Sequence, residues 1–359
     1  MNILITGAFG FVGSNVSTFL AARGYRLVAV DVALKESSAY SGFYTWDQLE
    51  QIDWTTIDAV IHLAGKAHDT RSASDPQSYF DVNVGLTEKV ISALVHYCDS
   101  ALVERSEGGD QRSEMSTTNE RMNSRTHALS KYIFFSSVKA VADRVEGVLT
   151  EDAAPDPQTP YGQSKLAAEG EVLKCGSSKV RGVETANGAN CANEGDFRTY
   201  ILRPCMIHGP GNKGNLNLLY GVVSKGVPWP LGAFENRRSF ASVGNVCAVV
   251  EGLLKGNVPS GIYQVADDEA LSTNELIGLM AETLGRRARI WKVSAGLVRA
   301  VARVGDVLRL PLNSERLKKL TESYVVSNAK IKRALGWERM PVSASEGMRK
   351  TLESFNSQQ

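Results

Sequence analysis

The sequence has few cysteines, almost no net charge and no long apolar segment. Its 359 residues include five cysteines, Cys98, Cys175, Cys191, Cys205 and Cys247. Their odd number, wide spacing and lack of a CxxC pair argue against a disulfide framework and a zinc site. No apolar run reaches the roughly 18 residues of a membrane span, and the N-terminus lacks the features of a signal peptide. These absences predict a cytoplasmic protein without a transmembrane segment or a metal site.

The charge balance also limits what the protein can bind. Forty Lys and Arg residues stand against 39 Asp and Glu residues, which gives a net charge of +1. A nucleic-acid-binding protein normally shows a basic excess, so we expect no nucleic-acid partner. The apolar fraction of 43% is that of a folded protein, and at about 150 residues per domain the length predicts two domains.

Short apolar runs alternate with amphipathic stretches through the first 205 residues. The runs are residues 3–5, 27–30, 59–61, 133–135 and 200–202. Such runs are typical of strands buried on both faces of a sheet. The amphipathic stretches between them, such as residues 83–97 and 162–173, have helical spacing. This alternation predicts an α/β protein with a doubly wound parallel sheet.

Two polar stretches interrupt the alternation, at about residues 104–128 and 175–196, and we interpret both as surface insertions. Residues 206–359 differ in composition and predict a smaller, mostly helical domain, with some strand or helix exchange with residues 1–205. A capping box at residues 272–275 opens one of its helices. Residues 286–310 are basic and amphipathic. For them a helix that covers this domain is favoured over a helix on a membrane surface.

A glycine-rich turn follows the first apolar run and precedes the first helix. Gly7 allows a tight turn, Gly10 lets the backbone approach a pyrophosphate, and Gly13 allows close packing of helix and strand. The anion would lie at the helix N-terminus, where backbone N–H groups are free. Asp31 closes the second run, where a carboxylate accepts hydrogen bonds from ribose hydroxyls and repels a 2′-phosphate. The pattern predicts NAD rather than NADP as the cofactor.

A second constellation predicts proton transfer. Tyr161 and Lys165 share one face of a helix, and a nearby ammonium lowers the pKa of a phenol. Ser137 ends the fourth run, 24 residues before Tyr161, at the edge of the sheet where ligands bind. A tyrosine tuned in this way exchanges a proton with a sugar hydroxyl while a hydride moves to or from nicotinamide.

Together these motifs resemble an extended short-chain dehydrogenase/reductase of the nucleotide-sugar epimerase/dehydratase family. The TGAFGFVG segment at residues 6–13, IHLAG at 61–65, LRP at 202–204 and LGW at 335–337 are similar to motifs of that family. Ser137, Tyr161 and Lys165 match its catalytic residues, and Asn83 matches its structural asparagine. The resemblance implies a Rossmann fold with a smaller substrate domain, and a homodimer.

The resemblance also implies which residues contact NAD. They lie in the glycine-rich turn, after the second and fourth strands, on the tyrosine helix and at the crossover between the domains. The implied residues are Gly7, Gly10, Phe11, Gly13, Asp31, Leu63, Ala64, Gly65, Asn83, Ser136, Tyr161, Lys165 and Pro204.

The substrate domain is similar to one bacterial subgroup that acts on UDP-sugars or other diphosphate-linked sugars in surface-polysaccharide synthesis. By position, the resemblance implies that Asn215 and Arg238 contact the sugar diphosphate, and Ser137 the sugar. For His68 two interpretations stay open: a residue that borders the sugar pocket, or an ordinary loop residue. Members that remove water carry Asp-Glu after the catalytic serine, whereas residues 138–139 here are Val-Lys, which argues against a dehydratase.

Three functions therefore stay open. The favoured one is an NAD-dependent 4-epimerase of a UDP-hexose or UDP-N-acetylhexosamine, acting through a 4-keto intermediate. The second is an NAD(P)H-dependent 4-reductase of a UDP-4-keto-6-deoxy-N-acetylhexosamine. The third is a non-catalytic NAD-binding protein, against which the intact Ser137, Tyr161 and Lys165 argue.

Overall fold

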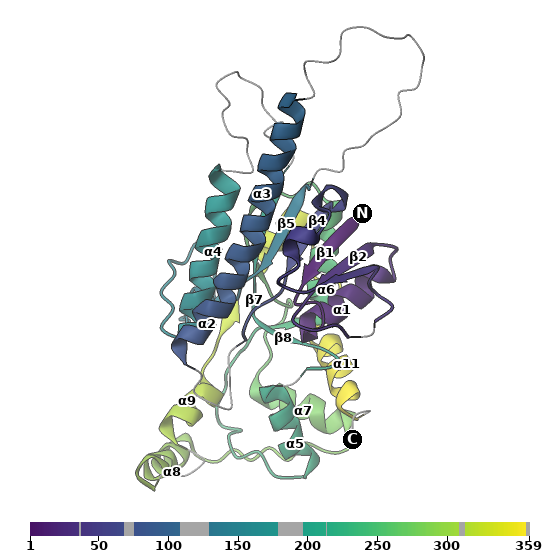
Figure 1. Ribbon diagram of the computed structural model, residues 1–359. Coiled ribbons are helices and arrows are strands. Elements are labelled where there is room, and N and C mark those ends of the chain that lie inside the picture. The colour runs from purple at the N-terminus through teal and green to yellow at the C-terminus, as the bar shows by residue number, and fades with distance from the viewer. Residues whose placement is uncertain are drawn as a thin grey trace. The chain divides into compact units, whose positions relative to one another are not determined.

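The computed structural model describes residues 1–35, 37–67, 75–107, 129–178, 197–212, 214–308 and 313–356. The chain divides into two compact units, and each contains separate stretches of sequence. Unit 1 comprises Met1–Val141, Pro155–Leu202 and Asn257–Ile262, and unit 2 comprises Ala142–Ala154, Arg203–Gly256 and Tyr263–Gln359. The chain therefore passes between the units several times (Figure 1). The predicted assignment of cofactor binding to the first domain and substrate binding to the second stays a prediction.

The centre of unit 1 is a seven-stranded sheet in the order β10-β7-β5-β4-β1-β2-β3. Its strands are β1 (Asn2–Thr6), β2 (Arg26–Val30), β3 (Gly42–Tyr44), β4 (Ala59–His62), β5 (Lys131–Phe135), β7 (Arg198–Pro204) and β10 (Gly261–Val265). All pairings from β3 across to β7 are parallel. The chain builds outward on one side of β1 and then on the other, so the order reverses between β1 and β4. Ligands of such sheets bind at the carboxyl ends of the strands beside this reversal.

Four α-helices accompany the described part of this sheet. They are α1 (Phe11–Ala21), α2 (Pro76–Asn83), α3 (Gly85–Glu107) and α4 (Pro160–Ser178). Helices α2, α3 and α4 contact one another, as Figure 1 shows. Val90 and Leu94 of α3 and Ala168 of α4 pack on apolar strand residues such as Val60 and Phe134 in one core cluster. This packing confirms the predicted α/β architecture.

The two predicted insertions overlap the ends of two helices. Helix α3 continues to Glu107 and α4 continues to Ser178, so the first residues of both segments are helical. The insertions themselves stay a prediction. The rest of each segment, residues 108–128 and 179–196, lies outside the described residues.

Unit 2 is mostly helical in its described part, as predicted. Its helices are α5 (Asn215–Ser224), α6 (Val243–Lys255), α7 (Thr273–Thr283), α8 (Ala295–Leu308), α9 (Ser314–Thr321), α10 (Ala329–Leu335) and α11 (Ala344–Asn356). Two small sheets pair β6 (Val148–Leu149) with β11 (Val325–Val326), and β8 (Met206–His208) with β9 (Phe240–Ser242). The predicted capping box opens α7, where the Ser272 hydroxyl accepts from the Glu275 N–H at 3.0 Å and a Glu275 oxygen accepts from the Ser272 N–H at 2.6 Å.

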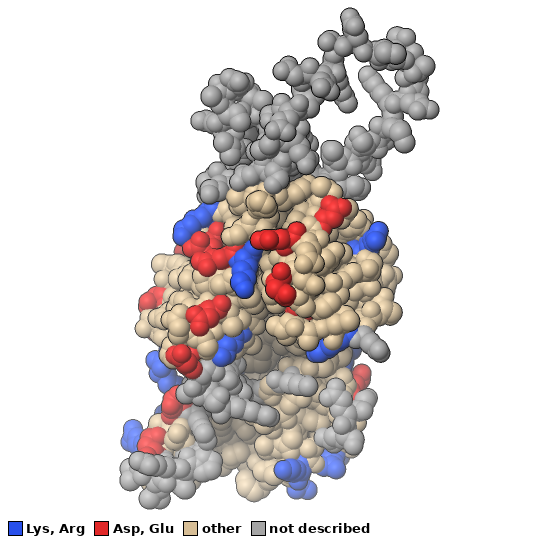
Figure 2. Space-filling model, in the orientation of Figure 1, with Lys and Arg blue, Asp and Glu red and all other residues tan. Residues whose placement is uncertain are grey.

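Short 3-10 helices complete the described elements: η1 (Leu49–Gln51), η2 (Trp54–Thr56) and η4 (Val138–Ala140). On the face shown in Figure 2, acidic and basic side chains of the described residues are interspersed, as the balanced composition leads one to expect. Among the residues described, no helix combines the length and the hydropathy needed to cross a membrane.

Candidate active site

The glycine-rich turn between β1 and α1 is packed too closely to hold side chains. Gly7 has a φ of +66°, and a Cβ atom there would lie 2.7 Å from the Ala64 backbone nitrogen. A Cβ atom on Gly13 would lie 2.3 Å from the Gly7 carbonyl oxygen. Helix α1 begins at Phe11, and its N-cap Gly10 provides no side-chain hydrogen bond. The first N–H groups of the helix are therefore left for an anion, which fits the predicted diphosphate of a dinucleotide.

Asp31 lies directly after β2 and contacts the same turn. Its Oδ2 atom accepts a hydrogen bond from the Phe9 N–H at 2.8 Å, and its Oδ1 atom accepts one from the Val32 N–H at 2.7 Å. The Tyr40 hydroxyl donates to the Ala8 carbonyl oxygen at 2.9 Å and adds a further contact to the turn. The structure thus brings the predicted ribose-binding carboxylate to the glycine-rich turn, and this arrangement fits NAD.

The segment after β4 is held between β1 and α4. The N–H groups of Leu63 and Ala64 donate to the Thr6 carbonyl and hydroxyl oxygens, each at 3.2 Å. Asn83, which is buried, accepts from the Lys66 N–H at 2.8 Å and donates to the Ser164 hydroxyl at 2.9 Å. Asn83 therefore joins this segment to the tyrosine helix.

Gly65 gives the closest approach between this segment and the predicted catalytic residues. A Cβ atom at Gly65 would lie 2.9 Å from Lys165 Nζ and 2.7 Å from Asn83 Oδ1. The absence of a side chain at Gly65 is what makes room for the lysine ammonium. The fourth-strand motif and the tyrosine helix, which are distant in the sequence, thus meet at one place in unit 1.

Lys165 is buried beneath the carboxyl end of β5. Its Nζ atom donates to the Phe135 carbonyl oxygen at 3.0 Å. Burial lowers the pKa of Lys165 to about 8, and the negative charge of Glu169 opposes this change. Glu169 is itself buried and accepts a hydrogen bond from the Ser136 hydroxyl at 2.5 Å. Sequence reasoning missed Glu169, although it follows Tyr161 and Lys165 at the same four-residue spacing on one helix face.

Tyr161 and Ser137 face each other at the amino end of α4. Burial raises the pKa of Tyr161, and a hydrogen bond with the Ser137 side chain partly offsets this. Ser137 also caps η4, where its hydroxyl accepts from the Lys139 N–H at 3.2 Å. The Tyr79 ring packs against the Tyr161 ring with centroids 6.2 Å apart. The pair can hold and transfer a proton at one hydroxyl position of a bound substrate.

One sequence-based expectation about Tyr161 was wrong. A nearby ammonium was expected to lower the pKa of the phenol, but in the structure the pKa lies above its ordinary value. Lys165 Nζ donates instead to the Phe135 carbonyl, and desolvation of the ring dominates. The hydrogen bond with the Ser137 side chain favours the phenolate.

The remaining predicted residues lie in unit 2 or outside the described residues. Pro204 ends β7, and Asn215 begins α5. Arg238 is half-buried, and its Nε atom donates to the Glu322 carbonyl oxygen at 3.1 Å. Burial lowers the pKa of Arg238, and the Glu322 charge opposes this change. His68 lies outside the described residues, so its predicted place beside the sugar stays a prediction.

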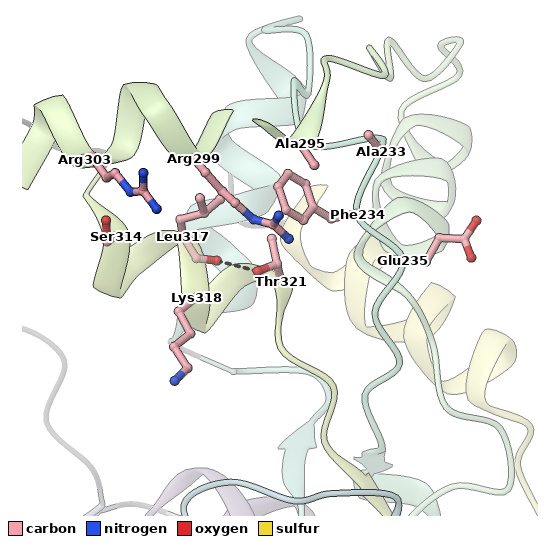
Figure 3. A pocket seen from close by; sticks show the side chains of 10 residues that line it. All are labelled: Ala233, Phe234, Glu235, Ala295, Arg299, Arg303, Ser314, Leu317, Lys318 and Thr321. Carbon is pink, nitrogen blue, oxygen red and sulfur yellow. Dashed lines mark hydrogen bonds between the residues drawn. The ribbon is translucent and has the colours of Figure 1, made fainter. Parts of the chain in front are cut away.

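A pocket of about 610 Å³ in unit 2 was not predicted (Figure 3). It lies between α8 and α9 and the segment at residues 233–235. Arg299, Arg303 and Lys318 give it a basic character, which Glu235 partly balances. The Arg299 guanidinium lies 5.8 Å from the centroid of the Phe234 ring. The basic residues on α8 were the signal in the sequence, but their grouping with α9 depends on the fold.

Comparisons with known proteins agree with this fold and with NAD as the cofactor. A family model described as "NAD dependent epimerase/dehydratase family" matches residues 3–266. The UDP-glucose 4-epimerase of Vibrio cholerae is 26% identical, over 99% of this chain and 95% of the relative. The N-acetyl-alpha-D-glucosaminyl-diphospho-ditrans,octacis-undecaprenol 4-epimerase of Escherichia coli O157:H7 is 25% identical, over 98% and 94%. The solved structure of MoeE5 in complex with UDP-glucuronic acid and NAD has a TM-score of 0.68 at 20% identity and covers 100% of both chains, which confirms the predicted fold.

Proposed function

The chain belongs to the NAD dependent epimerase/dehydratase family, and from this premise we propose that it is a 4-epimerase of a hexose or N-acetylhexosamine linked to UDP or to another diphosphate carrier. The observation that carries the proposal is the meeting of Ser137, Tyr161 and Lys165 beside a turn that fits NAD. Two relatives that align over nearly the whole chain have names that describe 4-epimerases. We place the reaction in the synthesis of surface-polysaccharide sugars.

The residues of the glycine-rich turn would hold the cofactor. The free N–H groups after Gly10 would face the diphosphate, and Asp31 would accept hydrogen bonds from the adenosine ribose. When bound, NAD supplies the hydride acceptor for C4 of the sugar and, once reduced, the hydride donor for the return step. The reaction therefore needs no net reductant, and a 4-keto sugar is its intermediate.

Tyr161 would exchange the proton of the sugar's C4 hydroxyl. As the phenolate it would take the C4 hydroxyl proton while the hydride leaves C4, and as the phenol it would return that proton to the 4-keto oxygen when the hydride comes back. Ser137 shares the hydrogen bond and lowers the cost of the phenolate form. Lys165 would orient the ribose next to the nicotinamide, because its ammonium lies beside Gly65 and the end of β5.

The sugar of the proposed substrate is linked to a diphosphate carrier, either UDP or a lipid. We assign Arg238 and Asn215 to the diphosphate, since a guanidinium pairs well with phosphate oxygens, and His68 to the sugar pocket. One relative's name describes a UDP-linked sugar and the other's an undecaprenol-diphosphate-linked sugar. The diphosphate is common to both, and the assay below can be run with either carrier.

The decisive experiment supplies substrate without cofactor. Purified protein is incubated with UDP-glucose or UDP-N-acetylglucosamine, and the sugars are separated by chromatography. We expect the galacto epimer to appear, because bound NAD is regenerated in each cycle. If no epimer forms and NAD(P)H is consumed on a UDP-4-keto-6-deoxy-N-acetylhexosamine, the protein is the 4-reductase and the proposal fails.

Two variants separate an enzyme from a binding protein. Tyr161→Phe should lose about 100-fold or more of the turnover, because it removes the group that transfers the proton. Lys174→Met is the matched control, since Lys174 is on the same helix but has a side chain that is 72% exposed and paired with Glu171. Full turnover by Tyr161→Phe would contradict a catalytic role. The homodimer implied by the resemblance stays a prediction that sedimentation would test.

A further inference from the structure

Residues 286–304 carry an unusual concentration of positive charge. This stretch contains six arginines and lysines and no acidic residue, whereas the whole chain has a net charge of +1. Four of the six, Arg286, Arg287, Arg289 and Lys292, precede α8 and are exposed. Two of them are tied to the fold, since Arg286 donates to the Ser224 carbonyl oxygen at 2.6 Å and Arg289 to the Gly226 carbonyl oxygen at 3.4 Å. The cations are thus held on a fixed backbone.

The same stretch leaves large apolar side chains in water. Leu297, Val301 and Val304 on α8 are 59%, 47% and 52% exposed, and their spacing places them along one stripe of the helix. Trp291, just before the helix, is 58% exposed. We call these four residues the apolar stripe. Single exposed apolar residues are ordinary, but four within fourteen residues of a basic segment require an explanation.

Helix α8 already packs on unit 2 through a different face. Val298 and Ala302 are buried there and belong to the cluster around Trp229. Arg299 and Arg303 project from α8 into the pocket toward α9 (Figure 3). Helix α8 therefore covers unit 2, as the sequence predicted. The residues of the apolar stripe on α8 lie on another face of the helix and take no part in this packing.

We propose that the apolar stripe and the four preceding cations bind the surface of an anionic lipid membrane. A tryptophan and aliphatic side chains enter the boundary between headgroups and acyl chains, and exposed arginine and lysine residues are attracted to anionic headgroups. The stripe is short, so binding is weak and reversible, and the protein exchanges between membrane and solution. This contact goes beyond the proposed 4-epimerase activity and does not require it.

A second copy of this chain fits the surface less well. A two-fold contact through the stripe would place two segments of six positive charges and no negative charge against each other. An anionic bilayer instead offers negative charge next to an apolar layer, which is the complement of both features. Charge complementarity thus favours the lipid surface.

Vesicle flotation tests the proposal on the full chain. Vesicles of phosphatidylglycerol and phosphatidylcholine are compared with vesicles of phosphatidylcholine alone, at low and at 0.5 M salt. We expect the protein to float with the anionic vesicles at low salt, and to do so about tenfold less with neutral vesicles or at high salt, because salt screens the attraction. Equal flotation with both kinds of vesicle, or none with either, would overturn the proposal.

Variants assign the contact to this surface. A triple variant, Leu297→Ser, Val301→Ser and Val304→Ser, should lose about tenfold in vesicle binding. Its matched control changes Val148 and Leu173 to Ser, which are 56% and 48% exposed elsewhere. A charge variant, Arg286→Glu with Arg287→Glu, should lose binding to anionic vesicles without touching the stripe. If the triple variant floats like the wild type, or loses self-association instead of vesicle binding, the proposal is wrong.

Trp291 provides a direct readout. Of the five tryptophans, Trp291 is the exposed one, so its emission should shift to shorter wavelength when anionic vesicles are added. The shift should be absent in Trp291→Phe. Epimerisation of a soluble UDP-sugar by the triple variant is measured in parallel and should equal that of the wild type. A wild-type protein that epimerises UDP-sugars but does not bind anionic vesicles would refute this proposal alone. A wild-type protein that binds the vesicles but does not epimerise would refute the proposed function alone.

Discussion

Lys165 shows how burial changes the chemistry of a single residue. Burial removes water from its ammonium group. In place of water, the Phe135 carbonyl oxygen accepts a hydrogen bond from the ammonium, and the negative charge of Glu169 stabilises it. The pKa of about 8 means that both protonation states are accessible near neutral pH. A group that changes charge so easily makes the stability of the protein depend on pH.

The sign of that dependence follows from the two states of the chain. The Lys165 pKa is about 8 in the folded protein, whereas an ordinary lysine, as in the unfolded chain, has a pKa of 10.5, so between these limits the unfolded chain binds more protons. The free energy of unfolding should therefore rise as the pH increases above 8, by up to about 1.4 kcal/mol per pH unit. Urea denaturation between pH 7.5 and 9.5 measures this rise.

Two variants isolate the contribution of Lys165 in that experiment. Lys165→Met should flatten the rise, because the titrating group is gone, whereas Lys174→Met should leave it unchanged, because the Lys174 side chain is 72% exposed. An equal slope in Lys165→Met and wild type would show that the buried ammonium does not carry the effect.

At the scale of elements, the turn between β1 and α1 is so closely packed that it leaves no room for added side chains. Gly13→Ala would place a methyl group 2.3 Å from the Gly7 carbonyl oxygen, where backbone lies on both sides. We expect this change to lower the free energy of unfolding by at least about 2 kcal/mol and to weaken NAD binding, because the turn must open. Urea denaturation and titration with NAD measure the two effects.

Gly278→Ala is the matched control for that prediction. Gly278 lies within α7, and a Cβ atom there would have nothing within 4 Å. The same substitution should therefore raise the free energy of unfolding by about 0.5–1 kcal/mol, because alanine favours the helix. If both variants changed stability in the same direction, close packing at Gly13 would not be the cause.

The sequence predicted the strands that are buried on both faces of the sheet and missed the edge strands β3 and β10. All five apolar runs lie in the central strands β1, β2, β4, β5 and β7. The edge strand β3 has three half-buried residues and no apolar run, so nothing in the sequence distinguished it from a loop. Strand β10 was missed because it lies far along the chain, between helices of the other unit.

The candidate site likewise contains residues that the sequence predicted and features that it missed. Motif spacing found Ser137, Tyr161, Lys165 and the glycine-rich turn, because these residues are close in sequence or follow successive strands. The pKa direction of Tyr161 and the role of Glu169 depend on how much water the fold removes, and no local pattern reports this. The residues for proton transfer could be predicted from residue types and their spacing, but the direction of the Tyr161 pKa shift could not.

At the scale of the whole molecule, unit 1 is not a continuous stretch of sequence. Its final piece, Asn257–Ile262, lies beside β7. There the Val258 carbonyl oxygen accepts hydrogen bonds from the Arg198 side chain at 2.7 Å and from the Tyr200 hydroxyl at 2.9 Å. A fragment of residues 1–205 lacks these partners and exposes β7 as an unpaired edge.

We expect the fragment of residues 1–205 to aggregate or to unfold without a cooperative transition. Burial of the Tyr200 ring and the bonds to Val258 are lost together, and an open apolar edge favours association between chains. Circular dichroism during urea titration and analytical sedimentation measure the two outcomes. A soluble fragment that unfolds cooperatively and binds NAD would show that Asn257–Ile262 is dispensable.

The position of Asn257–Ile262 also fixes the order of events during protein synthesis. Residues 203–256 leave the ribosome before β10 does, so the sheet remains one strand short while part of the other unit is already outside. Domains that are continuous in sequence can finish folding one after the other as they emerge. Here the sheet of the first unit is completed only after part of the second unit has emerged, and the nascent chain presents an incomplete sheet edge to chaperones until β10 has emerged at residue 265.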